Sequence, residues 1–265
     1  MRKLLLLLIF SIHLFGALLK APLLFVDEQK QTATIEVNGV DIGLSGFVVH
    51  EISSEHNTIL QSAKIIAYDA EKKLATLKLS PFESLTNQAL PKGTYKVQKG
   101  DLAVLAFGYS RALLIAPDEN VYYKLSKGFK IQWVHPDLFA SHLSSEGHPT
   151  PLKEDFDTFS DLSSVGLIFI YLNQKVYTID AKSFTILNVN NAPLKESNNK
   201  LPFYSRVDTI DANWFGAGSG ELKEYEPHYY ELLAKHNRKN KELYETLKSG
   251  DKKLHYLLKE FEIKE

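Results

Sequence analysis

The sequence predicts an α+β protein in which short strands come first and charged helices come last. Strand-like segments recur about every ten residues between positions 22 and 109, which is typical of a small barrel or sandwich. Two continuous apolar runs, residues 112–116 and 165–171, have the pattern of fully buried strands. Residues 221–265 combine a helical period with a high density of charge. Together these patterns favour a β-rich part, a small α/β part and a helical C-terminal tail.

Residues 1–17 have the pattern of a secretory signal peptide. Arg2 and Lys3 precede a mostly apolar run, residues 4–15, and small residues follow at the expected cleavage point near Ala17. The run is shorter than the roughly 20 residues that a membrane span requires. We therefore expect export with cleavage, an uncleaved anchor being the alternative, and no membrane span after cleavage.

The β-rich part is expected to cover residues 22–109. Residues 32–37 alternate polar and apolar side chains, and Asn38-Gly39 predicts a hairpin turn because both residues tolerate positive φ. Residues 99–101 predict a second turn leading into a strand. The further predicted strands are residues 46–49, 63–68, 74–79, 95–97 and 102–107.

The α/β part is expected over residues 110–193. The second helix should place Leu138, Phe139, His142 and Leu143 on one face. The predicted helices are residues 120–127, 136–144 and 153–159, and the predicted strands are residues 112–116, 130–134, 165–171, 175–180 and 184–189.

Residues 194–220 predict a loop that ends in a glycine-rich hinge, and residues 221–265 predict a tail with ten basic and ten acidic residues. Asn240 falls on a heptad seam, and residues 249–251 interrupt that seam. One interpretation is an antiparallel helical pair folded against the body; the other is a coiled coil that mediates self-association or a partner contact. The seam consists of Tyr229, Leu233, His236, Asn240, Leu243, Leu247, Leu254, Leu257 and Phe261.

The composition excludes several classes of function. The chain contains no cysteine, which excludes disulfides, thiolate metal sites, cysteine nucleophiles and a lipid-modified N-terminal cysteine. Its net charge is −1 and its isoelectric point is near 6.8, so no global field attracts nucleic acid. With 44% hydrophobic and 24% charged residues, the chain can form a folded core.

No catalytic, metal-binding or cofactor-binding pattern emerges from the polar residues. His135, His142 and His148 lie near Asp137, but their spacing matches no known helical zinc pair. The acidic residues of 154–157 are best interpreted as favourable charge in the first turn of a helix. Neither a phosphate-binding loop nor a nucleophile elbow is present. We therefore expect a protein that is not an enzyme and that binds no cofactor.

Several segments in combination resemble a known family. The segments are residues 41–49 (DIGLSGFVV), 107–117 (FGYSRALLIAP), 133–139 (WVHPDLF), 147–156 (GHPTPLKEDF) and 201–207 (LPFYSRV). This set resembles the N-terminal domain of the plasminogen-binding protein PgbA family of spiral Gram-negative bacteria. The resemblance covers roughly residues 22–220.

The resemblance implies an envelope or surface protein that captures host plasminogen. Kringle modules of plasminogen bind a cation and an anion held a fixed distance apart, which a C-terminal lysine provides. The chain ends Lys264-Glu265, so an internal mimic on the tail is required. Its candidate residues are Arg238, Lys239, Lys241, Glu242, Lys259, Glu262 and Lys264. The competing interpretation is a solvated helical face with weak ion pairs.

Two other classes of function stay open. The first is a structural or assembly module of the envelope or of an appendage, with an oligomerising tail. The second is a periplasmic small-ligand binder or enzyme with a deep pocket lined by His135, Asp137 and His148. The expected location is the periplasm, the outer membrane or the cell surface.

Overall fold

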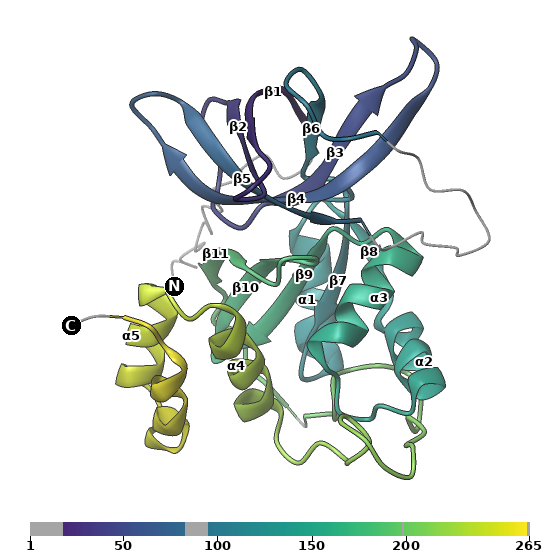
Figure 1. Cartoon of the computed structure of the whole chain (residues 1–265). Helices are drawn as coiled ribbons and strands as arrows, with labels where there is room; N and C mark the ends of the chain where they lie inside the picture. The colour runs from purple at the N-terminus through teal and green to yellow at the C-terminus, as the bar shows by residue number, and fades with distance from the viewer. Residues whose placement is uncertain (1–17, 83–94, 198, 264–265) are drawn as a thin grey trace, which may run out of the picture.

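The computed structural model describes residues 18–82, 95–197 and 199–263. The signal peptide expected over residues 1–17 lies outside these residues, as does Lys264. Figure 1 shows a β-barrel above a second sheet, with helices around that sheet and a helical group at the C-terminal end. The predicted α+β fold is confirmed.

Six strands close the barrel in the order β1-β2-β5-β4-β3-β6. All neighbouring pairs are antiparallel. The strands are β1 (Leu19–Asp27), β2 (Thr32–Glu36), β3 (Ser45–Glu51), β4 (Asn57–Asp69), β5 (Leu74–Pro81) and β6 (Leu102–Leu105). Inward side chains alternate with outward ones along each strand, so Ala33 and Ile35 of β2 are buried while Glu36 is exposed.

Two predictions within the barrel are wrong. Asn38-Gly39 turns the chain, and Gly39 has a φ of +73°, but the strands on either side do not pair: β2 lies between β1 and β5, whereas β3 lies between β4 and β6. Residues 95–97 form no strand. The turn at residues 99–101 is present, with Gly100 at a φ of +96°.

The second sheet has the strand order β11-β10-β9-β7-β8. Strand β7 runs parallel to both of its neighbours, β8 and β9, whereas β9, β10 and β11 form antiparallel pairs. The strands are β7 (Arg111–Ile115), β8 (Gln132–Val134), β9 (Leu167–Leu172), β10 (Lys175–Asp180) and β11 (Ile186–Asn191).

Helices cover both faces of this sheet. Alternate side chains of β7 point to opposite faces: Leu113 and Ile115 join one core cluster, and Ala112 and Leu114 join the other. Helix α1 (Glu119–Gly128) packs in the second cluster together with the barrel interior. Helices α2 (Pro136–Glu146), α3 (Lys153–Ser163) and α4 (Tyr225–His236) pack in the first.

The expected apolar face of α2 is only partly correct. Phe139 and Leu143 are buried, but Leu138 is 58% exposed. Leu138 lies on the first turn of the helix, where the neighbouring residue Asp137 binds Arg206 of the loop. Phe139 stacks on Phe203 of the loop, whereas Leu138 faces solvent.

Asp180 joins the barrel to the second sheet. Its carboxylate is fully buried and accepts hydrogen bonds from the Ser45 hydroxyl (2.6 Å), the Ser45 backbone N–H (3.0 Å) and the Tyr109 hydroxyl (2.6 Å). The backbone N–H groups of Lys182 (3.0 Å) and Ser183 (2.6 Å) complete the set. Burial, followed by the nearby Asp180 charge, raises the pKa of Tyr109 well above its usual value. Tyr109 is therefore a neutral donor at this junction.

Candidate partner-binding surface of the C-terminal helices

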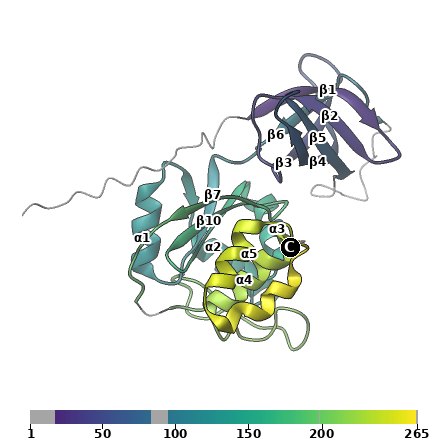
Figure 2. The ribbon, with the colours of Figure 1, turned by 90° about the vertical axis from the view of Figure 1, so that its left-hand side faces the viewer.

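The C-terminal segment folds back as three short helices: α4, α5 (Lys241–Ser249) and the 3₁₀ helix η1 (Lys252–Glu260). Figure 2 shows this group lying in front of the second sheet, and in Figure 1 α4 lies between the sheet and α5. The buried leucines Leu243, Leu247, Leu254 and Leu257 belong to the same core cluster as α4 and the sheet. Most of the predicted heptad seam is therefore buried within this chain, in three short helices where the first interpretation expected a pair.

Turn residues explain the path of the chain between these helices. Asn237 is buried and donates its side-chain amide to the carbonyls of Phe184 and Leu233, while its oxygen accepts from the backbone N–H of Ile186. Asn240 caps α5 by accepting a hydrogen bond of 2.9 Å from the backbone N–H of Leu243. The prediction that Asn240 occupies a coiled-coil core position is therefore wrong.

The fold brings candidate residues from two distant segments together. The Arg238 guanidinium binds the Glu262 carboxylate at 3.0 Å, and its Nε donates to the Glu260 carbonyl at 2.9 Å. The backbone N–H of Glu262 donates to the carbonyl of Arg238 at 2.8 Å. The Arg238 and Glu262 side chains are each about half exposed. This contact places the predicted residues after α4 beside those at the end of η1.

Four other candidates are exposed on the same helical group: Lys239, Lys241, Glu242 and Lys259. Within the described part of the chain, none of them forms an ion pair. Tyr244 and Phe261 make an edge-to-face contact at 5.5 Å between ring centroids, which packs α5 against the end of η1. We call Arg238, Lys239, Lys241, Glu242, Lys259 and Glu262 the tail surface.

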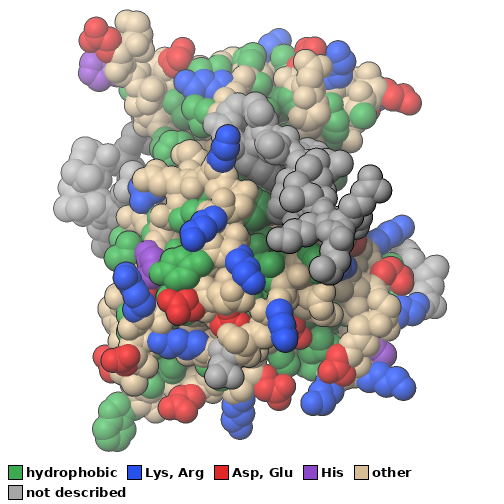
Figure 3. Space-filling model, turned by 180° about the vertical axis from the view of Figure 1, so that it is seen from behind, with side chains coloured by type: hydrophobic (Ala, Val, Ile, Leu, Met, Phe, Trp, Pro, Cys, Tyr) green, Lys and Arg blue, Asp and Glu red, His purple; other side chains and the backbone are tan. Residues whose placement is uncertain are grey.

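Charges of both signs are interspersed on the face of the molecule that Figure 3 shows. Figure 3 shows Lys, Arg, Asp and Glu side chains mixed over the reverse face, without a broad region of one sign.

The three residues of the predicted pocket do not come together around a cavity. His135 accepts a hydrogen bond from the backbone N–H of Asp137 at the start of α2, and burial lowers its pKa. Burial favours a higher pKa for Asp137, but the hydrogen bonds from Arg206 outweigh it and lower the pKa. His148 instead binds the buried carboxylate of Asp155 at 2.8 Å. All of these side chains stabilise helix starts and loops.

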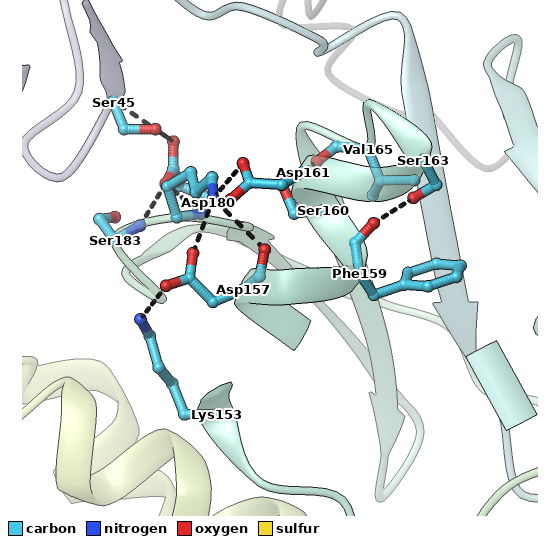
Figure 4. A network of polar contacts seen from close by, with 11 residues as sticks. Ser45, Lys153, Asp157, Phe159, Ser160, Asp161, Ser163, Val165, Asp180 and Ser183 are labelled. Carbon is cyan, nitrogen blue, oxygen red and sulfur yellow. Dashed lines mark hydrogen bonds and ion pairs between the residues drawn. The ribbon is translucent and has the colours of Figure 1, made fainter. Parts of the chain in front are cut away.

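A cleft lies elsewhere, between the barrel and α3. This cleft has a volume of about 590 Å³ and is lined by residues of β3, β4, α3 and the segment after β10. Lys182 forms ion pairs with Asp157 and Asp161. Lys153 binds the other carboxylate oxygen of Asp157, and Figure 4 shows Lys153, Asp157 and Asp161 in this network. The Lys182–Asp157 distance is 3.0 Å. The two lysines and the two aspartates form ion pairs with one another, so these four charges need no ligand as a partner.

Sequence analysis missed both this network and the Asp180 junction. The acidic residues of 154–157 were interpreted as helix-start charge, and Asp155 does accept a hydrogen bond from the Leu152 backbone N–H. Asp157, however, binds lysines from two segments. Among the residues that the structure describes, no group of three or more His, Asp or Glu side chains could hold a metal ion.

The comparisons with known proteins decide the family. The family described as "Plasminogen-binding protein pgbA N-terminal" matches residues 18–233, which is most of the chain. The chain belongs to the PgbA N-terminal family. Two relatives, both named "Plasminogen-binding protein PgbA" and both from Helicobacter pylori, are 27% (strain 26695) and 28% (strain J99) identical over 225 residues. No solved structure matches.

The match to the PgbA family has two limits that bear on the candidate surface. It ends at Leu233, within α4, so the whole tail surface lies beyond it. The alignment with each relative covers 83% of this chain but 48% or 49% of the relative. The chain thus spans about half the length of the curated relatives it matches. Among residues 18–82, 95–197 and 199–263, no helix is long and apolar enough to cross a bilayer.

Proposed function

We propose that this chain is an exported, non-catalytic protein that binds host plasminogen through lysine-type recognition. The observation that carries the proposal is the family match over residues 18–233, with relatives that bear the name plasminogen-binding protein. The signal-like residues 1–17 support export to the envelope or the cell surface.

The tail surface is the proposed ligand for the kringles. A kringle that accepts lysine requires a cation and a carboxylate at a set separation. Arg238 and Glu262 pair with each other at 3.0 Å, and their side chains are about half exposed. The exposed cations Lys241 and Lys259 and the exposed carboxylate of Glu242 are then left to contact the partner.

Plasminogen binding to the immobilised whole chain, measured with and without aminocaproic acid, tests the recognition mechanism. We expect this lysine analogue to abolish binding, because it competes for the lysine sites of the kringles. Binding that persists undiminished at saturating analogue rejects lysine-type recognition. Absence of any plasminogen binding rejects the proposed function itself.

A triple variant locates the contact. Replacing Lys239, Lys241 and Lys259 with glutamine should weaken plasminogen binding by tenfold or more, since it removes the three exposed lysines of the tail surface. A matched control replaces three lysines on the barrel side, Lys30, Lys72 and Lys96, whose side chains are 72% to 82% exposed. Equal losses in both variants indicate a general charge effect. If neither loses affinity while aminocaproic acid still competes, the lysine mimic lies outside the tail surface.

Protease accessibility on intact cells tests the location of the chain. Protease treatment of intact cells should cleave the chain if it reaches the surface, and plasminogen binding by living cells requires that location. Protection from protease until the outer membrane is opened places the chain in the periplasm, where capture of a host protein is impossible.

A further inference from the structure

A loop between the second sheet and α4 carries two aromatic side chains that are almost fully exposed. Trp214 is 99% exposed and Phe215 is 87% exposed. Both values exceed those of the other large exposed hydrophobic residues, such as Leu162 (73%) and Phe25 (61%). Isolated exposed apolar residues are common on proteins, but two adjacent and almost uncovered aromatic rings are unusual and indicate contact with something outside the chain.

Hydrogen bonds hold the first half of this loop against the turn after α2. The backbone N–H of Asn213 donates to the carbonyl of Gly147 at 2.9 Å, and its side-chain amide donates to the carbonyl of Glu146 at 2.6 Å. The backbone N–H of Asp211 and the hydroxyl of Ser144 lie 3.0 Å apart. Gly147 has a φ of +72°, and a Cβ there would lie 2.3 Å from the Asn213 side chain. The clamp therefore requires glycine at this position.

The second half of the loop is held in the same way. The backbone N–H of Thr150 donates to the carbonyl of Gly218 at 3.0 Å, and the Thr150 hydroxyl donates to the carbonyl of Gly220 at 2.6 Å. Both ends of the tip are thus anchored to the segment between α2 and α3. A rigid tip binds with less loss of conformational entropy than a disordered one.

The tip is chemically suited to a lipid interface. Residues 212–220 contain no charged side chain, so insertion of the tip buries no charge. Tryptophan is enriched where hydrocarbon meets headgroups, because its ring is apolar and its N–H can remain hydrated. A shallow position in this boundary leaves the rest of the molecule in water.

The size of the tip argues against a protein partner as the main occupant. Each aromatic side chain can bury about 150–250 Å², whereas a specific protein interface needs about 800 Å² on each partner. A projecting pair of rings provides too little surface for such an interface. A bilayer requires no shape complementarity and accepts a narrow tip.

The charges beside the tip select the type of lipid. Asp211 and Glu221 flank the uncharged residues, and Glu146 lies in the clamp. These carboxylates would approach the headgroups on insertion and would be repelled by an anionic surface. We propose that Trp214 and Phe215 dock the protein onto a zwitterionic lipid bilayer, at the boundary between headgroups and acyl chains. This activity goes beyond the proposed binding of plasminogen and is independent of it.

Fluorescence of Trp214 tests the proposal directly. The sequence contains two tryptophans, so a Trp133→Phe variant of the whole chain leaves Trp214 as the sole reporter. Phosphatidylcholine vesicles should shift its emission to the blue, and bromine-labelled acyl chains should quench it. Vesicles of phosphatidylglycerol should produce a smaller shift. Unchanged Trp214 emission with phosphatidylcholine overturns the proposal, whatever residues 1–17 do.

Vesicle flotation provides the second measurement. The double substitution W214S/F215S should lower the partition coefficient onto phosphatidylcholine at least tenfold, and both residues are too exposed for the change to disturb folding. The matched control is Phe25→Ser, at an exposed position on the barrel; residues 1–17 are identical in every variant and cancel in the comparison. Equal losses in both variants overturn the proposal. So does a blue shift of Trp214 that occurs with plasminogen and not with vesicles, which assigns the tip to a protein pocket.

Discussion

Two charged contacts in this molecule differ in almost every physical respect. Asp180 at the junction of barrel and sheet is fully buried and accepts five hydrogen bonds. The Arg238–Glu262 pair of the tail surface is half exposed and is held by an ion pair and two backbone contacts. A buried charge whose hydrogen bonds are all made holds parts of a fold in position. An exposed charge, by contrast, can exchange its partner for a ligand at small cost.

The same difference appears in how each region is packed. The junction combines polar contacts with close approach of the Gly43 backbone to a side chain: Gly43 has a φ of +101°, and a Cβ there would lie 2.4 Å from the Thr185 side chain. The tail is held by leucines that reach the core from α5 and η1. The polar face of the tail therefore does not contribute to the core, and substitutions on it should affect binding more than stability.

The largest expected effect concerns the junction. Asp180→Asn replaces one acceptor oxygen by an NH₂ group that faces donors, so several buried N–H and O–H groups lose their partner. Each unsatisfied buried group costs about 1–3 kcal/mol, and we expect the free energy of unfolding to fall by about 3 kcal/mol or more. Urea unfolding followed by circular dichroism measures this loss.

Asp161→Asn is the control for the junction. Asp161 binds Lys182, but its side chain is 31% exposed, so water can replace the lost contact. We expect a decrease of about 1 kcal/mol or less. If both variants lose the same stability, the buried carboxylate is not what holds the barrel to the sheet.

The next effect concerns the packing of the tail. Leu247 is 1% exposed and belongs to the core cluster shared by α4, α5 and the second sheet. Leu247→Ala should lower the free energy of unfolding by about 2–5 kcal/mol, because it removes buried methyl groups and leaves a cavity. The control is Leu162→Ala on α3, where the side chain is 73% exposed and the expected change is within about 0.5 kcal/mol. A Leu247→Ala variant as stable as the parent chain would show that α5 is not part of the cooperative fold.

Patterns confined to one element predicted the fold well. The apolar run of residues 112–116 corresponds to β7 (Arg111–Ile115), and the run of residues 165–171 corresponds to β9 (Leu167–Leu172), because strands buried on both faces lack polar positions. Pairing could not be predicted in the same way. Asn38-Gly39 has the chemistry of a hairpin, but β2 pairs with β1 and β5, and that choice depends on residues far away in the sequence.

The sequence predicted which residues belong to the candidate site, but not how these residues are arranged in space. Sequence analysis named Arg238 and Glu262, but their contact across the tail depends on Asn237 and Asn240, which redirect the chain between α4 and α5. Asp180 went unnoticed because its donors come from three separate segments of the chain, so no local spacing marks it. Contacts of this kind can be identified only once the chain is folded.

The smallest expected effect tests whether the Arg238–Glu262 ion pair of the tail surface is weak compared with the buried contacts of Asp180. A double-mutant cycle of Arg238→Gln and Glu262→Gln should give a coupling energy of about 0.2–1 kcal/mol, because both side chains are half exposed. The coupling should decrease as salt is added, since water and ions screen the pair. The backbone contact between Glu262 and Arg238 remains in every variant, so the cycle isolates the ion pair. A coupling above about 2 kcal/mol that resists salt would contradict the comparison: the pair would then serve the fold as Asp180 does, and these two residues could not exchange each other for a ligand at small cost.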